Sequence, residues 1–366
     1  MAVAQFNPLR LLFASTPVGA IGSGIGGGVE FILQNLAQEM ILRGHKVDIV
    51  APQGSITFIS KVNTPIIEIT GEMQGSIQQL NRDTPISIIP NSVLTKMWEF
   101  IGKEQSNYHL IVNFAYDWLP FYLSHFINIP IAHLVSMGSL SKIMDEIIEK
   151  TSIRFPGTIA VYTKAQAETF PFASRCRIVA NGIDLKDYQY CEKPDNYLVW
   201  IARISPEKGL EDAVEVAKNT GIRLKIMGLL QDKSYWESIQ QNYPDAPVEY
   251  LGFLPVREMQ LVLRRSRGYL MTHRWSEAFG MTAIQSLACG VPVITYNKGG
   301  PAEIVRHGQT GWLVESGNLV ELVKAINNLD KLDRLACRQQ AEAEYSIQVY
   351  GNRMENWFYD ILAQTS

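Results

Sequence analysis

Residues 272–317, THRWSEAFGMTAIQSLACGVPVITYNKGGPAEIVRHGQTGWLVESG, form the stretch that decides the fold. It joins four short motifs in a fixed order: S-E-x-F-G, A-C-G-x-P-V-I, G-G-P-x-E-I-V and T-G-x-L-V. Upstream, the pattern predicts a strand at 198–201, a Pro-Glu-Lys-Gly turn, a helix at 210–219 and a strand at 224–227. Such alternation of strands and helices is typical of a doubly wound parallel sheet.

The amino-terminal half shows the same alternation. A strand at 11–14, a glycine-rich loop, a helix at 30–42 and a strand at 47–51 are expected, with Gly44 ending the helix. Apolar runs predict further strands at 86–89, 110–114, 131–135, 159–162 and 177–179.

The predicted class is therefore α/β, with two Rossmann-like doubly wound domains. We expect an amino-terminal domain at 1–190, a carboxy-terminal domain at 191–345, and a final helix at 346–366 that crosses back to the first domain. Sheets of this kind bind ligands beyond the carboxyl ends of their strands, so two such domains predict a site in a cleft between them.

Composition narrows the function classes. The chain has 366 residues, enough for two apolar cores, and its net charge of -3 makes nucleic acid an unexpected partner. Its four cysteines lack C-x-x-C spacing, which excludes a zinc ribbon. We see neither a signal peptide nor a transmembrane segment and expect a cytoplasmic protein. Oligomeric state, including a homo-oligomer, and peripheral membrane contact stay open.

The glycine loop at 22–27 matches G-x-G-x-x-G, the dinucleotide-binding pattern of many oxidoreductases. That pattern needs its first glycine at the end of the strand, whereas residues 15–20 intervene here, and no acidic residue follows the second strand. A mobile turn without a ligand is one alternative. We favour a third interpretation, in which Gly27 and Gly28, just ahead of the helix, bring backbone N–H groups to an anion.

The motifs of 272–317 resemble the nucleotide-sugar domain of the family-four retaining glycosyltransferases, which have the GT-B architecture. The resemblance extends to GGVE at 27–30, RGHKVDIVAP at 43–52, NGID at 181–184 and ARISPEKG at 202–209. It therefore covers both halves of the chain. It implies an enzyme whose partners are a nucleotide sugar and an acceptor, with no cofactor, the UDP-sugar being the donor substrate.

Arg203 and Lys208 follow a predicted strand and precede a helix, where a guanidinium and an ammonium can hold a diphosphate. The resemblance implies that both bind the leaving diphosphate and that Glu277 contacts the donor sugar, and these three are the catalytic candidates. Gln285 stands where the family usually has a second glutamate on the ribose. On a helix, eight residues would separate Glu277 from Gln285 by roughly 12 Å, about the separation of the sugar and ribose ends of a nucleotide sugar.

Glycines 299 and 300 precede Pro301, a good first helical residue, so their N–H groups are expected to meet sugar or phosphate oxygens. The full set of expected donor-binding residues is Gly27, Gly28, Arg203, Lys208, Phe253, Leu254, Glu277, Phe279, Gly280, Met281 and Gln285.

For the acceptor we expect aromatic and polar residues of the first domain. They are Tyr116, Asp117, Trp118, His133 and Ser136. The family usually has a histidine six residues after the position of Pro130, where this chain has Ser136. His133 lies on a predicted strand and is better explained as a packed residue than as a replacement.

The resemblance implies retention of configuration by reaction on one face of the sugar. The sequence contains no D-x-D, so we predict no metal. The stretch STPVGAIGSGIGGGVE at 15–30 is also similar to UDP-glucose:tetrahydrobiopterin glucosyltransferases, which suggests glucose as the sugar and a pterin as the acceptor. Open alternatives are a catalytically silent nucleotide-sugar-binding protein, a transferase for a lipid or saccharide acceptor, and a dehydrogenase.

Overall fold

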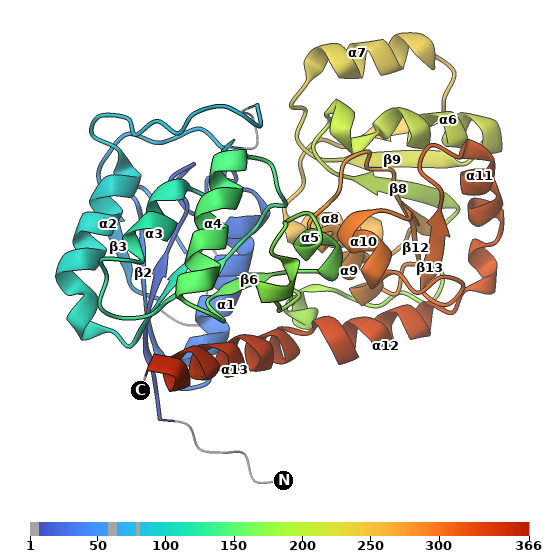
Figure 1. Ribbon diagram of the computed structural model, residues 1–366. Helices are drawn as coiled ribbons and strands as arrows, with labels where there is room; N and C mark the ends of the chain where they lie inside the picture. The colour runs from blue at the N-terminus through green and yellow to red at the C-terminus, as the bar shows by residue number, and fades with distance from the viewer. Residues whose placement is uncertain (1–6, 58–63, 78–80, 366) are drawn as a thin grey trace. The chain divides into compact units, whose positions relative to one another are not determined.

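Strands and helices alternate along the chain, and all strand pairs within its two sheets are parallel. The computed structural model describes residues 7–57, 64–77 and 81–365. The chain divides into two units, one of residues 1–181 with 347–366 and the other of residues 182–346 (Figure 1).

The first unit contains a seven-stranded sheet in the order β3-β2-β1-β4-β5-β6-β7. Its strands are β1 (Arg10–Ala14), β2 (Lys46–Pro52), β3 (Ile66–Ile69), β4 (Leu110–Asn113), β5 (Ile131–Leu134), β6 (Ile159–Val161) and β7 (Arg177–Ile178). Its helices are α1 (Gly28–Leu42), α2 (Val93–Glu104), α3 (Trp118–Leu123), α4 (Lys142–Arg154), α5 (Lys164–Ala167) and α13 (Ile347–Thr365).

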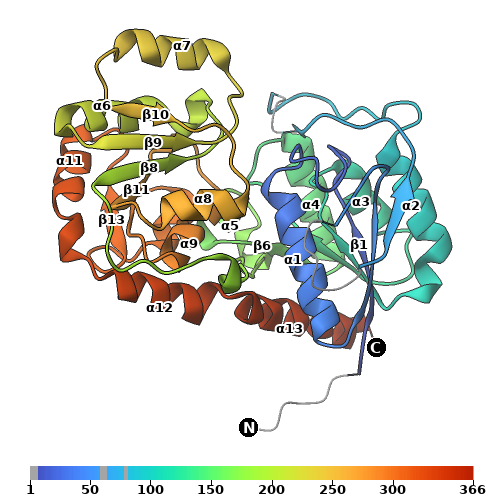
Figure 2. The same cartoon turned by 180° about the vertical axis from the view of Figure 1, so that it is seen from behind.

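Strand alternation explains the core of this unit. Leu12, Val50 and Ile111 point to the face covered by α2, whose Met97 and Trp98 pack against them. On α1, residues at helical spacing such as Leu33 and Leu36 are fully buried. The last helix, α13, packs against α1 (Figure 2).

The second unit contains a six-stranded sheet in the order β10-β9-β8-β11-β12-β13. Its strands are β8 (Tyr197–Ile201), β9 (Arg223–Met227), β10 (Val248–Tyr250), β11 (Gly268–Met271), β12 (Val293–Tyr296) and β13 (Gly311–Val314). Its helices are α6 (Leu210–Thr220), α7 (Lys233–Asn242), α8 (Val256–Leu263), α9 (Met281–Ala288), α10 (Gly299–Ile304), α11 (Leu319–Asn327) and α12 (Arg334–Tyr345).

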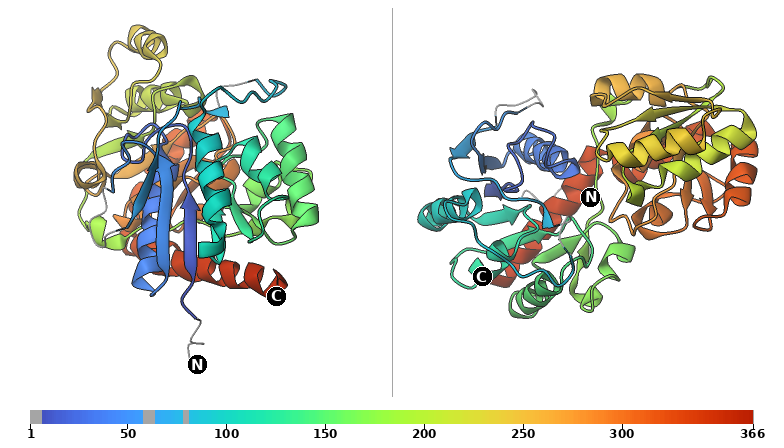
Figure 3. Two further views of the ribbon diagram at one scale, coloured as in Figure 1. Left: turned by 90° about the vertical axis from the view of Figure 1, so that its left-hand side faces the viewer. Right: turned by 90° about the horizontal axis from the view of Figure 1, so that it is seen from above.

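Here one sheet face carries Leu198, Trp200 and Ile226, which pack with α6 and α11 in a single apolar cluster. Helix α9 contacts β11 and β12 and packs against α12. Helices thus cover both faces of the sheet, as Figure 3 shows, and the class is α/β as predicted. Within the described residues, no helix is both long enough and apolar enough to cross a bilayer.

Two local predictions are wrong. Residues 86–89 form no strand. Prolines flank this short run on both sides, and because proline has no backbone N–H, few hydrogen bonds to a neighbouring strand could form there. The sequence did not predict β3, which lies earlier in the chain and is only half-buried. Glu277 lies in the loop before α9, so the helical separation expected between Glu277 and Gln285 does not apply.

Candidate active site

The sheet of the second unit reverses its strand order between β8 and β11, which pair as neighbours. In open α/β sheets, such a switch point leaves a crevice beyond the carboxyl ends of the strands, where ligands bind. The segments 202–209 and 272–280 follow these two strands. Their side chains therefore gather at the crevice of this unit.

Direct contacts hold the two segments together. Thr272 donates its hydroxyl to the Gly209 carbonyl at 2.7 Å, and the Arg274 N–H donates to the Glu207 carbonyl at 2.8 Å. Gly209 has a φ of +64°, and a Cβ there would lie 2.1 Å from the Thr272 carbonyl oxygen. Only glycine allows this approach.

Lys208 and Glu277 meet across these segments. The Lys208 Nζ lies 2.6 Å from Oε2 of Glu277, and Trp275 donates its Nε1–H to the same oxygen at 2.7 Å. The Lys208 Nζ also lies 4.6 Å from the centre of the Trp275 ring, a cation–π contact. Both hydrogen bonds fall on Oε2, so Oε1 of Glu277 has no hydrogen-bond partner among the described residues.

The environment keeps Glu277 ionised. Burial by itself would raise the pKa of Glu277, but the charge and hydrogen bond of Lys208, with the bond from Trp275, outweigh it and lower the pKa below its usual value. The pair is only 13% and 19% exposed. An ionised carboxylate with one unbonded oxygen can accept hydrogen bonds from ligand hydroxyl groups.

Arg203 lies on the same segment as Lys208. It donates from Nη1 to the Gln231 Oε1 at 2.5 Å, and its Nη2 lies 3.7 Å from Glu207. The guanidinium has five N–H donors, so several remain for a ligand. The segment after β8 thus presents two cations at the crevice, one partly exposed and one in a buried ion pair.

Glycines 299 and 300 serve packing more than the expected ligand contact. The Gly300 N–H donates to the Glu277 carbonyl at 2.7 Å, so it is not free for a phosphate. A Cβ on Gly299 would lie 2.7 Å from the Glu277 carbonyl oxygen, and one on Gly300 would lie 2.6 Å from the Phe279 Cα. The two glycines let α10 press against the segment that carries Glu277.

The other expected donor-binding residues of this unit surround α9 and β10. Gln285 on α9 is buried and donates from Nε2 to the Tyr188 hydroxyl at 2.9 Å. Met281 begins this helix after Gly280, whose φ is +105°.

Phe279 is buried, with its ring 6.1 Å from that of Tyr345. Phe253, beyond β10, is 68% exposed, and the adjacent Leu254 is half-buried. An exposed aromatic ring at a strand's carboxyl end is available for stacking with a flat ligand.

In the first unit, the glycine loop encloses a carboxylate of its own chain. The N–H groups of Gly22, Gly24 and Gly26 donate to the Glu30 carboxylate at 2.8, 3.3 and 2.6 Å, and the Glu30 residue is only 3% exposed. These N–H groups are therefore occupied, which argues against a dinucleotide pyrophosphate at the same place. Gly27 and Gly28 follow this closed turn at the start of α1.

The expected acceptor residues follow two adjacent strands of the first unit. Tyr116, Asp117 and Trp118 come after β4, and Ser136 comes after β5, the strand paired with β4. All four are half-buried. The Asp117 carboxylate accepts the Leu119 N–H at 3.2 Å and so caps α3, and burial raises its pKa although this bond opposes the shift.

His133 is fully buried, and both of its ring nitrogens have hydrogen-bond partners. Its Nδ1 lies 3.1 Å from the Asn113 Nδ2, which can only donate, so the ring proton is on Nε2, 2.8 Å from the Ser124 hydroxyl. Ser124 donates to the Pro120 carbonyl at 3.0 Å, and burial lowers the pKa of His133 to about 3. His133 is thus a packed strand residue whose ring nitrogens both have partners inside the first unit, and a contact with an acceptor stays a prediction.

Comparison with known proteins relates the second unit to glycosyl transferases. Residues 189–345 match the family model of Glycosyl transferases group 1. An uncharacterized glycosyltransferase of Methanocaldococcus jannaschii is 28% identical over 174 residues, 47% of this chain and 48% of that relative. Glycogen synthase of Mycobacterium tuberculosis is 25% identical over 184 residues, 47% of this chain and 44% of the relative. The chain spans about half the length of the curated relatives it matches.

Solved structures match nearly the whole chain. Anabaena HepE, solved in complex with UDP-glucose, has a TM-score of 0.76 at 18% identity, over 96% of this chain and 100% of HepE. Sucrose-phosphate synthase of Thermosynechococcus elongatus has a TM-score of 0.76 at 17% identity, over 97% and 100% of the two chains. The chain has the GT-B fold. Its two units are the two Rossmann-like domains of that fold.

Sequence reasoning missed three residues of this GT-B chain. Trp275 donates a hydrogen bond to Glu277, His273 is buried on the same segment, and Glu30 accepts the N–H groups of the glycine loop. A sequence signal existed for the first two, because both lie within seven residues before the S-E-x-F-G glycine, inside the motif-rich stretch 272–317. For Glu30 the signal was its position in the GGVE motif.

Proposed function

We propose that the protein is a retaining, metal-independent hexosyltransferase that moves glucose from UDP-glucose to a small hydroxylated acceptor. One observation carries this proposal: Lys208 and Glu277 form a buried pair at the switch point of the second unit, within the residues that match group 1 glycosyl transferases. A cation for a leaving diphosphate and an acceptor for sugar hydroxyl groups lie 2.6 Å apart there.

The chemistry we propose needs no protein nucleophile. The bond between C1 of glucose and the β-phosphate oxygen breaks, and the acceptor oxygen bonds C1 on the same face. The acceptor proton passes to the departing phosphate oxygen, which leaves as UDP. Arg203 and Lys208 stabilise the negative charge that grows on this oxygen, an electrostatic effect that is strong in a preorganised site.

UDP-glucose as the donor is supported by the likeness to HepE, which was solved with that molecule. The fit of Gln285 is also reasonable, because its amide can both donate to and accept from ribose hydroxyl groups. Its present bond to Tyr188 uses only Nε2, and its Oε1 is available to accept.

For the acceptor we propose the side chain of tetrahydrobiopterin. The half-buried rings of Tyr116 and Trp118 follow β4, and Trp118 stacks on Tyr122 at 4.5 Å. Aromatic faces at a strand's carboxyl end suit a flat pterin, and the Asp117 carboxylate can accept from its amino and ring N–H groups.

An acceptor screen tests the proposal. Purified protein is given UDP-glucose with tetrahydrobiopterin, with simple saccharides or with lipid vesicles, and UDP release is measured with NMR analysis of the new glycosidic bond. We expect UDP release with the pterin and an α-linked product. Binding of UDP-glucose without release for any acceptor would instead indicate a silent binding protein. A β-linked product would contradict retention.

A further inference from the structure

A buried histidine lies next to the Lys208–Glu277 pair and has no assigned role. His273 is the second residue after β11 and is only 1% exposed. It belongs to the segment 272–280, which follows β11 and carries Glu277, so it lies at the same crevice of the second unit. The charges of Glu277 and Lys208 both affect the pKa of its imidazole.

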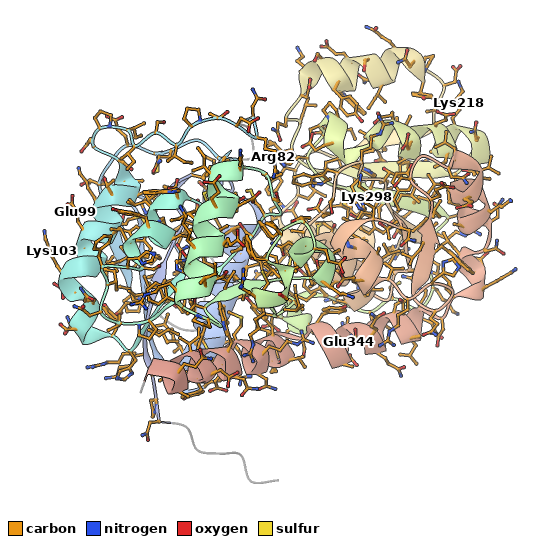
Figure 4. The ribbon with its side chains drawn as sticks, in the orientation of Figure 1. Arg82, Glu99, Lys103, Lys218, Lys298 and Glu344 are labelled. Atoms are coloured by element: carbon orange, nitrogen blue, oxygen red, sulfur yellow. The ribbon has the colours of Figure 1, made fainter. Side chains whose placement is uncertain are left out.

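Its hydrogen bonds fix the ring proton. The Nε2 lies 3.0 Å from the main-chain carbonyl of Lys298, the residue before α10 (labelled in Figure 4). A carbonyl only accepts, so the proton is on Nε2. Burial lowers the pKa of His273, more than the nearby carbonyls of Lys298 and Met271 raise it, so the ring is neutral and Nδ1 carries a lone pair.

That lone pair has no hydrogen-bond donor among the described residues, and the nearby Met271 carbonyl is itself an acceptor and cannot satisfy it. A buried acceptor without a donor is unfavourable, and native proteins rarely leave one unless a ligand or water supplies the donor. Oε1 of Glu277 is a second acceptor without a partner in the same crevice. His273 Nδ1 is the buried one of these two acceptors, and both suit a ligand with hydroxyl donors. In UDP-glucose such donors lie on the ribose and on the hexose, and the ribose is assigned to Gln285 above, which leaves the hexose.

We propose that Nδ1 of His273 accepts a hydrogen bond from a hydroxyl group of the transferred hexose, beside Glu277, and that His273 thereby helps select the sugar. This inference rests on the proposed function. Discrimination follows because a sugar lacking that hydroxyl would leave the buried acceptor unpaired.

The variant His273→Gln tests the role with little disturbance. A glutamine amide can keep the donor to the Lys298 carbonyl that Nε2 supplies, but it has no acceptor at the place of Nδ1. Calorimetry then compares UDP with UDP-glucose, on the natural chain and on the variant. We expect the variant to bind UDP within about twofold of the natural chain and UDP-glucose about tenfold more weakly, as for loss of one hydrogen bond.

A series of UDP-deoxyglucoses, each lacking one hydroxyl, gives a second readout on the natural chain. We expect one analogue to bind about tenfold more weakly than UDP-glucose, and His273→Gln to remove that difference. Equal weakening of UDP and UDP-glucose by the variant, or the same analogue preference in both chains, would overturn the inference but leave the proposed function standing. If the natural chain binds UDP-glucose no better than an unrelated nucleotide, the inference about His273 and the proposed function are both wrong.

Discussion

Replacing Glu30 by glutamine should loosen the glycine loop of the first unit. The carboxylate accepts three glycine N–H groups, two of them at 2.8 and 2.6 Å, within the first turn of α1. In Glu30→Gln, one oxygen becomes an NH₂ group that faces N–H donors, and the negative charge near the helix N-terminus is lost.

The size of the effect follows from these contacts. A hydrogen bond to a charged group contributes about 1.5–3 kcal/mol, but Gly22 and Gly24 are exposed and water can replace part of the loss. We therefore expect a loss of about 2 kcal/mol. For a unit of about 200 residues this lowers the Tm by about 4–8 °C.

The assay is thermal unfolding, combined with amide hydrogen exchange at Gly22 and Gly26. Glu99→Gln is the matched control, because Glu99 is an exposed residue of α2 in the same unit (Figure 4). Exchange at the two glycines should accelerate only in Glu30→Gln. Equal melting temperatures and equal exchange in the two variants would refute the role given to Glu30.

Three further predictions follow. Asp117→Asn keeps an oxygen for the cap of α3 but loses the charge, so the KM for the acceptor should rise much more than the KM for UDP-glucose; equal changes would remove Asp117 from the acceptor site. Lys208→Met leaves the Glu277 carboxylate buried without its cation, which raises the pKa of Glu277. In the natural chain, the ion pair stabilises the fold at neutral pH, and this contribution is lost as pH falls through the lowered pKa of Glu277. In the variant, protonation of Glu277 at the higher pKa removes the cost of the unpaired charge. The Tm deficit of the variant should therefore narrow between about pH 7 and pH 4, and a constant deficit would contradict the pairing. Transfer should continue in excess chelator with an α-linked product, and recovery of lost activity by Mg²⁺ would contradict metal independence.

Much of the fold could be predicted from the sequence, because alternation of strands and helices has a clear period. The strands around Leu11 and Leu198 are continuous apolar runs, as expected for parallel strands buried on both faces. The edge strand β3 was missed because Ile66–Ile69 is short and half-buried and contains a glutamate. Nothing in its pattern separates it from a loop.

The sequence named candidate site residues, but it could not predict the contacts between them. Arg203 and Lys208 could be placed by motif and by position after a strand, yet the pairing of Lys208 with Glu277 depends on how Gly209 and Thr272 bring two distant segments together. Sequence spacing carries no information on that distance. For the same reason the closing of the glycine loop on Glu30 could not be predicted.

The central claim is that a nucleotide sugar binds beside Lys208, and calorimetric titration with UDP-glucose tests it most directly. Lys208→Ala is compared with the natural chain and with Lys218→Ala, which removes an exposed lysine in the last turn of α6 (Figure 4). We predict a Kd about tenfold or more weaker for Lys208→Ala, because a preorganised cation for the diphosphate is lost, and an unchanged Kd for Lys218→Ala. The same Kd for all three proteins would contradict the claim.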